Sequence, residues 1–149
     1  MFSVFSHEYY MKEALKEAQR ALELDEIPVG AIVVCQQQII ARSHNLTEQL
    51  TDVTAHAEIL AITSASRFLG SKYLRQCSMY ITLEPCVMCA GALAWSQLGQ
   101  LFIGASDSKR GFSQYGRSLL HPKTEVQEGI LELPCSQLLK DFFKQKRAT

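Results

Sequence analysis

The chain has 149 residues, of which 47% are hydrophobic and 20% are charged, and its formal net charge at pH 7 is zero. This size and composition predict one globular domain over residues 1–149, and the absence of any run of about 18 apolar residues argues against a membrane span. Residues 1–10 lack the basic start and apolar stretch of an export signal, and the five cysteines are an odd number. We therefore expect a cytoplasmic protein with free thiols.

The first third of the chain is predicted to form a helix followed by two strands. Ser6 has the side chain of an N-cap, and apolar residues then recur at helical spacing up to about residue 24. The β-branched run at residues 29–34 indicates a buried strand. Three glutamines at 36–38 form a polar turn, and residues 39–43 are expected to be the antiparallel partner of that strand.

The middle of the chain alternates between helices and strands. Residues 44–54 are polar and lack periodicity, which predicts a loop. Thr54 is expected to cap a helix from residue 55 to about residue 68, with Gly70 near its end. Residues 78–83 should form a buried strand, and Pro85 should open a helix that reaches about residue 98.

The last third of the chain is less regular at first. Residues 101–105 indicate another buried strand, and residues 107–122 are expected to contain a short helix at most. Residues 125–130 are predicted to be the last strand, and residues 136–146 a terminal helix. The apolar side chains of this helix should share one face: Leu138, Leu139, Phe142 and Phe143. Strands that alternate with helices predict an α/β layered domain with a partly parallel sheet.

Charge is distributed unevenly although it sums to zero. Acidic residues outnumber basic ones over residues 1–58, and the order is reversed over residues 101–149. The basic part could form a phosphate-binding face. It could also be an ordinary solvated surface whose basic helix end suits the helix dipole, and charge alone favours this second interpretation.

A histidine, a carboxylate and two cysteines stand at the spacing of a catalytic zinc site. His56 and Glu58 form a His-x-Glu pair, and Cys86 and Cys89 follow Pro85. Zinc in proteins is four-coordinate, and a catalytic site leaves one position for water. His56, Cys86 and Cys89 would supply three ligands, and Glu58 could reach the water without binding the ion. The joint pattern is the signature of zinc deaminases.

The predicted elements bring these side chains together. His56 and Glu58 fall near the start of one helix, and Cys86 and Cys89 fall at the start of the next, where positions three apart share a face. A helix N-terminus lowers the pKa of a thiol and so favours the thiolate that a metal needs. In an open α/β sheet, ligands bind outside the carboxyl ends of the strands, where these segments are expected.

Each part of the motif has a plainer interpretation when it is taken alone. A Cys-x-x-Cys pair could be a redox pair or half of a structural zinc site, and a lone histidine is more often a core or surface residue. A redox pair needs no His-x-Glu partner, and a closed structural site needs a fourth ligand that no second paired motif supplies. The three other cysteines, Cys35, Cys77 and Cys135, are expected to be small buried hydrophobic residues.

The reaction follows from the charges of the proposed ligands. Two thiolates and a neutral imidazole leave a bound zinc ion able to lower the pKa of water toward about 7. Glu58 would take a proton from that water, pass it to a ring nitrogen, and then protonate the departing amine so that ammonia leaves. The sequence therefore predicts hydrolytic deamination with Glu58 as the catalytic acid and base.

Further segments extend the match beyond the zinc motif. They are residues 5–11, 26–31, 54–59 and 82–92, together with the Asp-Phe-Phe run at 141–143. On these segments nearly the whole chain resembles the bacterial tRNA-specific adenosine deaminases, which convert the wobble adenosine of an anticodon loop to inosine. The resemblance implies a three-layer α/β/α cytidine-deaminase-like fold with a mixed five-stranded sheet. It also implies a homodimer with one Zn²⁺ per subunit and a tRNA anticodon loop as the partner.

The same resemblance assigns residues to the substrate pocket. The base-binding asparagine of the family falls on Asn45, and Pro28 and Val29 would help to wall the pocket. Ala105 and Asp107 would lie beside the bound nucleotide. A carboxamide can pair with a purine edge, although Asn45 and Asp107 could equally be turn residues without a ligand.

The sequence departs from the family pattern in two segments that the resemblance places near RNA. Residues 107–112 read Asp-Ser-Lys-Arg-Gly-Phe, where many members continue the aspartate with a Lys-Thr-Gly-Ala type run. Residues 95–97 read Trp-Ser-Gln, where some relatives have His-Ser-Arg. An exposed Trp95 could stack on a base, whereas a lone helical tryptophan is more often part of the core.

Three functions compete at this point. The first is adenosine-to-inosine deamination in tRNA, because a loop base can leave its stack and enter a pocket. The second is a zinc deaminase of a free nucleobase or nucleoside, such as guanine or cytosine. The third is a non-catalytic, zinc-stabilised RNA-binding module, which would need four protein ligands on its zinc ion.

Overall fold

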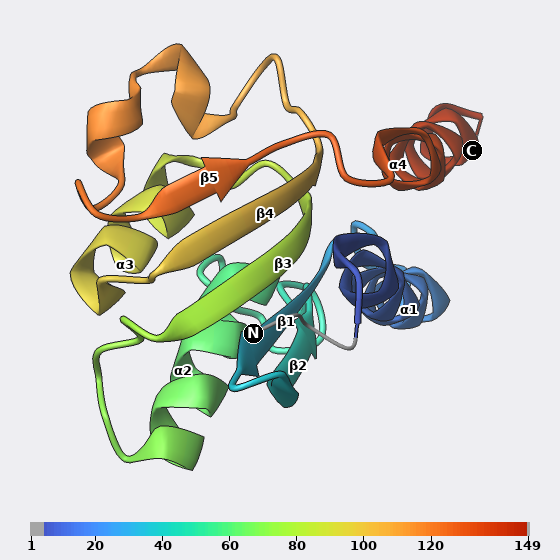
Figure 1. Ribbon diagram of the computed structural model, residues 1–149. Helices are drawn as coiled ribbons and strands as arrows, with labels where there is room; N and C mark the ends of the chain where they lie inside the picture. The colour runs from blue at the N-terminus through green and yellow to red at the C-terminus, as the bar shows by residue number, and fades with distance from the viewer. Residues whose placement is uncertain (1–4, 149) are drawn as a thin grey trace.

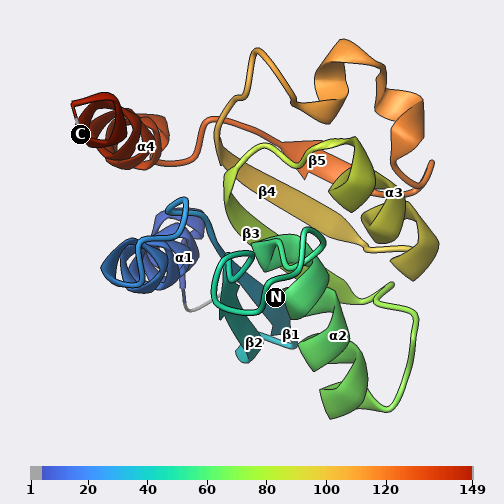
Figure 2. The same cartoon turned by 180° about the vertical axis from the view of Figure 1, so that it is seen from behind.

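The computed structural model of the protein describes residues 5–148. Residues 1–4, which belong to the segment used above against an export signal, and Thr149 lie outside the described residues. Five strands form one mixed sheet in the order β2-β1-β3-β4-β5, with helices on both of its faces (Figures 1 and 2). The predicted three-layer α/β/α fold with a mixed five-stranded sheet is confirmed.

The elements follow one another along the chain as helices that alternate with strands. The helices are α1 (His7–Glu23), α2 (Ala57–Leu69), α3 (Val87–Ser96) and α4 (Glu132–Arg147). The strands are β1 (Gly30–Cys35), β2 (Gln38–His44), β3 (Cys77–Leu83), β4 (Gln100–Ala105) and β5 (Glu125–Gln127). Two 3₁₀ helices lie between β4 and β5, at Phe112–Gln114 and Arg117–Leu119.

The sheet combines both kinds of strand pairing. Strand β1 is antiparallel to β2 and to β3, whereas the pairs β3–β4 and β4–β5 are parallel. The β1–β2 hairpin turns at Gln36 and Gln37, which have φ angles of 51° and 65°. Left-handed values at both central residues suit the twist of a two-residue hairpin, so the glutamine turn lies where it was predicted.

Side chains of each strand alternate between two apolar layers. In β1, Ala31 and Val33 pack on the side of α2 and α3, and Ile32 and Val34 pack on the side of α1 and α4. Gly30 begins this strand where α1 crosses it closely. A Cβ atom at Gly30 would collide with the backbone of α1, so this approach requires glycine.

Three predicted helix starts are wrong for local reasons. Helix α3 begins at Val87 with Cys86 as its N-cap, and not at Pro85, whose carbonyl accepts from the N–H of Phe112. Helix α2 begins at Ala57 with His56 as its N-cap, because Thr54 donates both its N–H and its hydroxyl to the Asp52 carboxylate instead of capping the helix. Helix α4 begins at Glu132, four residues earlier than expected. Pro134 lies in its first turn, where the missing N–H of proline costs no helical hydrogen bond.

Other boundaries and burial predictions also changed. Strand β5 ends at Gln127, shortly before Gly129 adopts a left-handed φ of 79°. Trp95 is 85% exposed, so of the two interpretations given above the structure excludes a position in the core. Cys77 and Cys135 are buried as expected, whereas Cys35 is half-buried. Within residues 5–148, no helix is both long enough and apolar enough to cross a membrane.

Candidate metal and catalytic site

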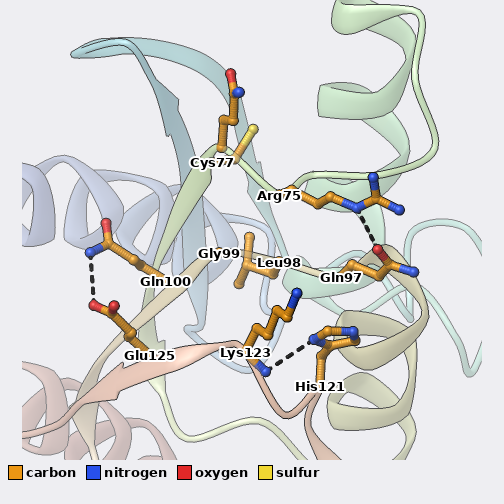
Figure 3. Close-up of a pocket in the computed structure, with 10 residues that line it drawn as sticks. Arg75, Cys77, Gln97, Leu98, Gly99, Gln100, His121, Lys123 and Glu125 are labelled. Carbon is orange, nitrogen blue, oxygen red and sulfur yellow. Dashed lines mark hydrogen bonds between the residues drawn. The ribbon is translucent and has the colours of Figure 1, made fainter.

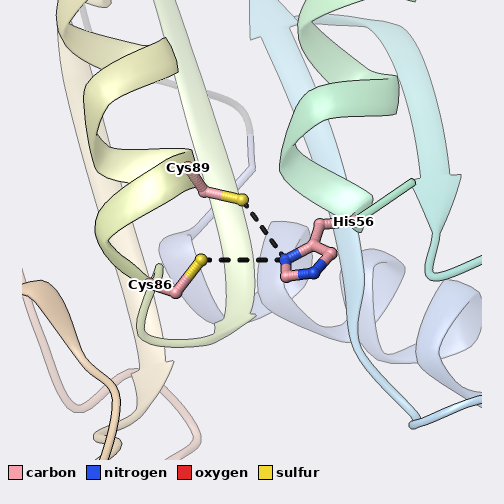
Figure 4. Close-up of side chains that lie close together, drawn as sticks. All are labelled: His56, Cys86 and Cys89. Atoms are coloured by element: carbon pink, nitrogen blue, oxygen red, sulfur yellow. Dashed lines mark hydrogen bonds between the residues drawn. The ribbon is translucent and has the colours of Figure 1, made fainter. Parts of the chain in front are cut away.

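Two neighbouring helices present the predicted metal ligands at their N-termini. His56 is the N-cap of α2, Cys86 is the N-cap of α3, and Cys89 lies in the first turn of α3. The His56 side chain accepts no hydrogen bond from the backbone of α2. The three side chains point toward one another across the gap between the helices instead (Figure 4).

The distances between these side chains suit one small cation. Nδ1 of His56 is 3.8 Å from Sγ of Cys86 and 3.5 Å from Sγ of Cys89. A tetrahedral zinc ion separates its sulfur and nitrogen ligands by roughly 3.6 Å, given its usual bond lengths. In the described part of the chain, the group of residues able to share an ion contains these three side chains. The donor set therefore fits zinc with three protein ligands.

The two thiols differ in protonation because they lie side by side. A hydrogen bond from Cys89 lowers the pKa of Cys86 to about 4, while the same contact and burial raise the pKa of Cys89 above its ordinary value. The hydrogen bond with Cys86 also raises the pKa of His56. The pair thus holds one proton between two sulfurs, at a position where a metal cation would replace it.

Glu58 lies beside this group in the first turn of α2. Its side chain is 4% exposed, and burial raises the pKa of its carboxyl group to about 7. A carboxyl group with such a pKa can both accept and release a proton near neutral pH. Glu58 therefore has the properties of an acid–base residue without being part of the ligand group.

A surface pocket of about 490 Å³ opens above these residues, at the carboxyl end of β3. Predicted residues that line it are Val29, Asn45, His56, Glu58, Cys86 and Asp107. Pro28 is buried and is not among the lining residues. Ala105 lines an adjoining hollow of about 440 Å³ instead. The structure thus gathers most of the predicted site residues around one cavity.

Asn45 is held in a fixed orientation at the edge of the pocket. Its Oδ1 accepts a hydrogen bond of 2.8 Å from the backbone N–H of Ala57, and its own N–H donates to the carbonyl of Val29. Because Oδ1 is engaged, the polar group that the side chain can offer to a ligand is the Nδ2 amide, which is a donor. Asn45 therefore links the residue before β1, the start of α2 and the pocket.

A buried glutamate that the sequence did not reveal holds the loop after β2. Glu26 is 1% exposed, and its Oε1 accepts from the hydroxyl of Thr47 and from the N–H of Glu48. Its Oε2 accepts from the N–H of Gln49 at 2.7 Å. The carboxylate thus fixes the loop that carries Asn45 and Thr47 to the pocket.

A second buried glutamate has the same role on the other side of the pocket. Oε1 of Glu84 accepts from the N–H of Asp107 at 3.0 Å, and its Oε2 accepts from the N–H of Ser113 at 2.9 Å. A Cβ atom at Gly111 would collide with this carboxylate, which explains the glycine. The sequence contains one signal for Glu84, because this charged residue directly follows the buried strand β3.

Helix α4 contributes Phe143 to the pocket, although the sequence predicted this side chain on the apolar face of the helix. Leu139 and Phe142 face the core as predicted, but Phe143 is 42% exposed and lines the pocket together with Ile27 and Arg110. The expected single apolar face of this helix is therefore divided between the core and the pocket wall.

Comparisons with known proteins agree with this geometry. Residues 5–147 match the family of MafB19-like deaminases. The tRNA-specific adenosine deaminase of Aquifex aeolicus is 45% identical over 145 residues, which cover 94% of this chain and 95% of that protein. A solved structure from work on A-to-I editing by tRNA:A34 deaminases at the wobble position is 40% identical, with a TM-score of 0.82 over 87% of this chain and 98% of that one. The guanine deaminase of Bacillus subtilis is 36% identical, with a TM-score of 0.66 over 68% and 66% of the two chains.

Proposed function

The chain belongs to the family of the tRNA-specific adenosine deaminases, and we propose that it converts adenosine to inosine at the wobble position of a tRNA anticodon loop. The observation that carries the proposal is the group formed by His56, Cys86 and Cys89, with the buried Glu58 beside it at a pocket. The reaction replaces the amine at C6 of the purine by the oxygen of water and releases ammonia.

We infer that His56, Cys86 and Cys89 hold one zinc ion per subunit. One imidazole nitrogen and two thiolates form the donor set of a catalytic zinc site with one open position. When bound, zinc acts there as a Lewis acid and lowers the pKa of a water molecule. The second cysteine releases its proton when the ion binds, which gives the site its neutral overall charge.

The protein residues then orient the base and move protons. Glu58 takes a proton from the attacking water and passes it to N1 of the adenine ring. It next delivers the second proton of that water to the nitrogen at C6, which leaves as ammonia. Val29 and Ile27 form an apolar wall for the ring, and Nδ2 of Asn45 donates to an acceptor on the purine.

The shape of the pocket suits a base that has left its stack. A volume of about 490 Å³ accommodates a nucleoside and opens to the surface, so that a polynucleotide can continue outside. Asp107 and Arg110 lie at this opening, where the guanidinium can meet a phosphate. The exposed nucleotides of an anticodon loop can be splayed out in the way that this arrangement requires.

The direct test compares ammonia release from different substrates. The zinc-loaded protein is incubated with a minimal anticodon stem-loop that carries adenosine at the wobble position, and with the same stem-loop carrying guanosine there. We expect inosine in the first product and no change in the second, with activity that declines as salt is raised. Absence of inosine from the adenosine stem-loop and from total tRNA would exclude the proposal.

Deamination of a free base is the second candidate, and the similarity to guanine deaminase favours it. That protein is 36% identical over about two thirds of each chain, whereas the tRNA enzyme of Aquifex aeolicus is 45% identical over more than nine tenths of both. Guanine, cytosine and their nucleosides therefore serve as competing substrates in the same assay. A non-catalytic zinc module is disfavoured, because the ligand group in residues 5–148 has three members and not four.

We further infer that two copies of the chain form a homodimer through the outer face of α3. Val87, Gly91 and Trp95 are spaced by four residues and therefore form one stripe, and Trp95 is 85% exposed. A stripe of this kind on a helix that also carries the metal ligands suits an isologous contact with a second copy.

Light scattering should give a dimer for the wild type and a monomer for Trp95→Glu. Leu133→Glu, on the exposed side of α4, is the matched control and should remain dimeric.

A further inference from the structure

Two cysteines outside the metal group face each other at the far end of the sheet. Cys35, the last residue of β1, is the direct partner of Cys77, the first residue of the antiparallel strand β3. Both side chains lie on the face covered by α2, where Cys77 belongs to the apolar core and Cys35 packs against it. Strand β3 runs about 20 Å from Cys77 to the pocket at its other end, so this pair is separate from Cys86 and Cys89.

The backbone geometry of the pair suits a covalent link. The N–H of Cys77 donates to the carbonyl of Leu74, outside the strand ladder, so Cys35 and Cys77 form a non-hydrogen-bonded pair. Cα atoms in such pairs are about 4.5 Å apart, within the range of about 4.4–6.8 Å seen across disulfides. Closure of a disulfide would therefore require side-chain rotation without strand movement.

A polar hollow gives small molecules access to the pair. It measures about 340 Å³, and both cysteines line it together with Tyr73 and Arg75. The Arg75 guanidinium lies 4.6 Å from the centroid of the Tyr73 ring, and its Nε donates to Oε1 of Gln97 (Figure 3). Within the described chain, no acidic side chain lines this hollow. The hollow thus offers an anionic reagent a basic side chain and no acidic one.

We propose that Cys35 and Cys77 are a reversible thiol–disulfide site that reacts with anionic low-molecular-weight disulfides such as oxidised glutathione. The sulfur of Cys35 attacks one sulfur of the reagent, the reagent's S–S bond breaks, and one thiol leaves. The sulfur of Cys77 then attacks the sulfur of Cys35 and releases the second thiol. Two protein thiols are oxidised, the reagent is reduced to two thiols, and these take up both protons.

The two thiols have unequal roles in this sequence. Cys35 is half-buried and reachable from the hollow, whereas Cys77 is 2% exposed. Burial also raises the pKa of Cys77 to about 12, so Cys77 does not supply the first thiolate. Cys35 is therefore the attacking thiol, and Cys77 is the thiol that resolves the mixed disulfide.

The test treats the zinc-loaded full-length chain with oxidised glutathione and maps the products by mass spectrometry. We expect a loss of about 2 Da, a 35–77 peptide cross-link in a monomeric band on a denaturing gel, and retained zinc. The melting temperature should rise by about 5 °C or more, because the bond closes a long loop. No cross-link, a cross-link between chains, or a product that stops at one glutathione would overturn the proposal.

Four variants separate the steps and test the preference for an anionic reagent. Cys77→Ser should accumulate one glutathione on Cys35, and Cys35→Ser should not react, because the remaining thiol is buried. Cys135→Ser removes a buried cysteine on α4 and should cross-link like the wild type. Arg75→Gln should slow the reaction with oxidised glutathione about threefold or more and leave that with the cationic disulfide cystamine unchanged or faster. Equal rates for both reagents in both proteins would exclude the preference for an anionic reagent.

Discussion

Two regions of this sheet fill their buried space with different kinds of side chain. Around the pocket, the carboxylates of Glu26, Glu58 and Glu84 are withdrawn from water. In the centre of β3 and β4, the buried side chains are apolar, as at Met79 and Leu101. Burying a charge costs free energy unless hydrogen bonds or a metal compensate it, whereas burying an apolar side chain stabilises the fold. The pocket region is thus organised for position and chemistry, and the centre of the sheet for stability.

Removal of the Glu58 carboxylate should reduce activity strongly without reducing stability, which is the largest effect expected from this comparison. Glu58→Gln keeps the size of the side chain but removes the group that moves protons, so we expect kcat to fall about 10²–10⁴-fold. Zinc content and the melting temperature should be unchanged or higher. Kinetics on the stem-loop, metal analysis and thermal melting measure these three quantities. Wild-type turnover in a zinc-loaded Glu58→Gln variant would mean that another group transfers the protons.

In the metal-free chain, Glu58 should also affect how stability depends on pH. Burial raises the pKa of Glu58 from 4.5 to about 7 in the folded chain, so the folded state holds its proton more tightly than the unfolded state. This contribution stabilises the fold below about pH 4.5 and is lost as pH rises through 7. Glu58→Gln should remove this part of the pH dependence, which melting curves between pH 4.5 and 8 would detect.

A truncation in the centre of the sheet should show the opposite behaviour. Leu101 is fully buried between the strands and α3, so Leu101→Ala leaves a cavity. We expect the free energy of unfolding to fall by about 2–5 kcal/mol, while turnover per folded molecule stays near that of the wild type. Urea denaturation gives the first quantity, and active-site titration gives the second. A loss of turnover in fully folded Leu101→Ala protein would contradict the proposed division.

Zinc binding should be coupled to protons through the cysteines of the pocket region. At neutral pH the lowered pKa of Cys86 leaves a thiolate, while the raised pKa of Cys89 keeps a thiol that must lose its proton to bind the ion. We therefore expect the association constant for zinc to fall about tenfold or more for each unit by which pH is lowered. Competition with a chelator at pH 6, 7 and 8 measures this slope. Cys135→Ser should leave the slope unchanged, and an affinity independent of pH would contradict this assignment of protons.

The sequence predicted the interior of the fold better than its edges. Strands β1, β3 and β4 lie where continuous apolar runs predicted them, because burial on both faces leaves a strong pattern. The start of α2 was misplaced because Thr54 binds Asp52, a choice between two local partners that periodicity does not register. The exposure of Trp95 could not be predicted either, because the sequence does not specify which face of α3 is covered.

The sequence also predicted some residues of the site and missed others. His56, Glu58, Cys86 and Cys89 were predicted because metal chemistry demands particular side chains at short spacings, and the structure brings them together. Glu84 was missed because its hydrogen bonds reach N–H groups 23 and 29 residues further along the chain. Partners of that kind exist only after folding, and backbone N–H groups carry no sequence signature.

Glu84 therefore gives the smallest expected effect, because it is a buried charge that positions the loop from Asp107 to Ser113 and does not transfer protons. In Glu84→Gln, one carboxylate oxygen becomes an NH₂ group that faces an N–H donor. The loop from Asp107 to Ser113 therefore loses one hydrogen bond, and the other is no longer charge-assisted. A charge-assisted bond contributes about 1.5–3 kcal/mol, and we expect KM for the stem-loop to rise roughly tenfold while kcat falls less than about threefold. Zinc content should be retained.

The exposed Glu128→Gln is the matched control for this substitution and should change neither constant. If kcat of Glu84→Gln instead falls as far as that of Glu58→Gln with zinc retained, Glu84 takes part in proton transfer. If neither constant changes, the loop keeps its position through the backbone bonds that remain, such as that from Phe112 N–H to the carbonyl of Pro85. This side of the pocket would then be held by its backbone, and Glu26 would remain as the buried carboxylate that positions a loop.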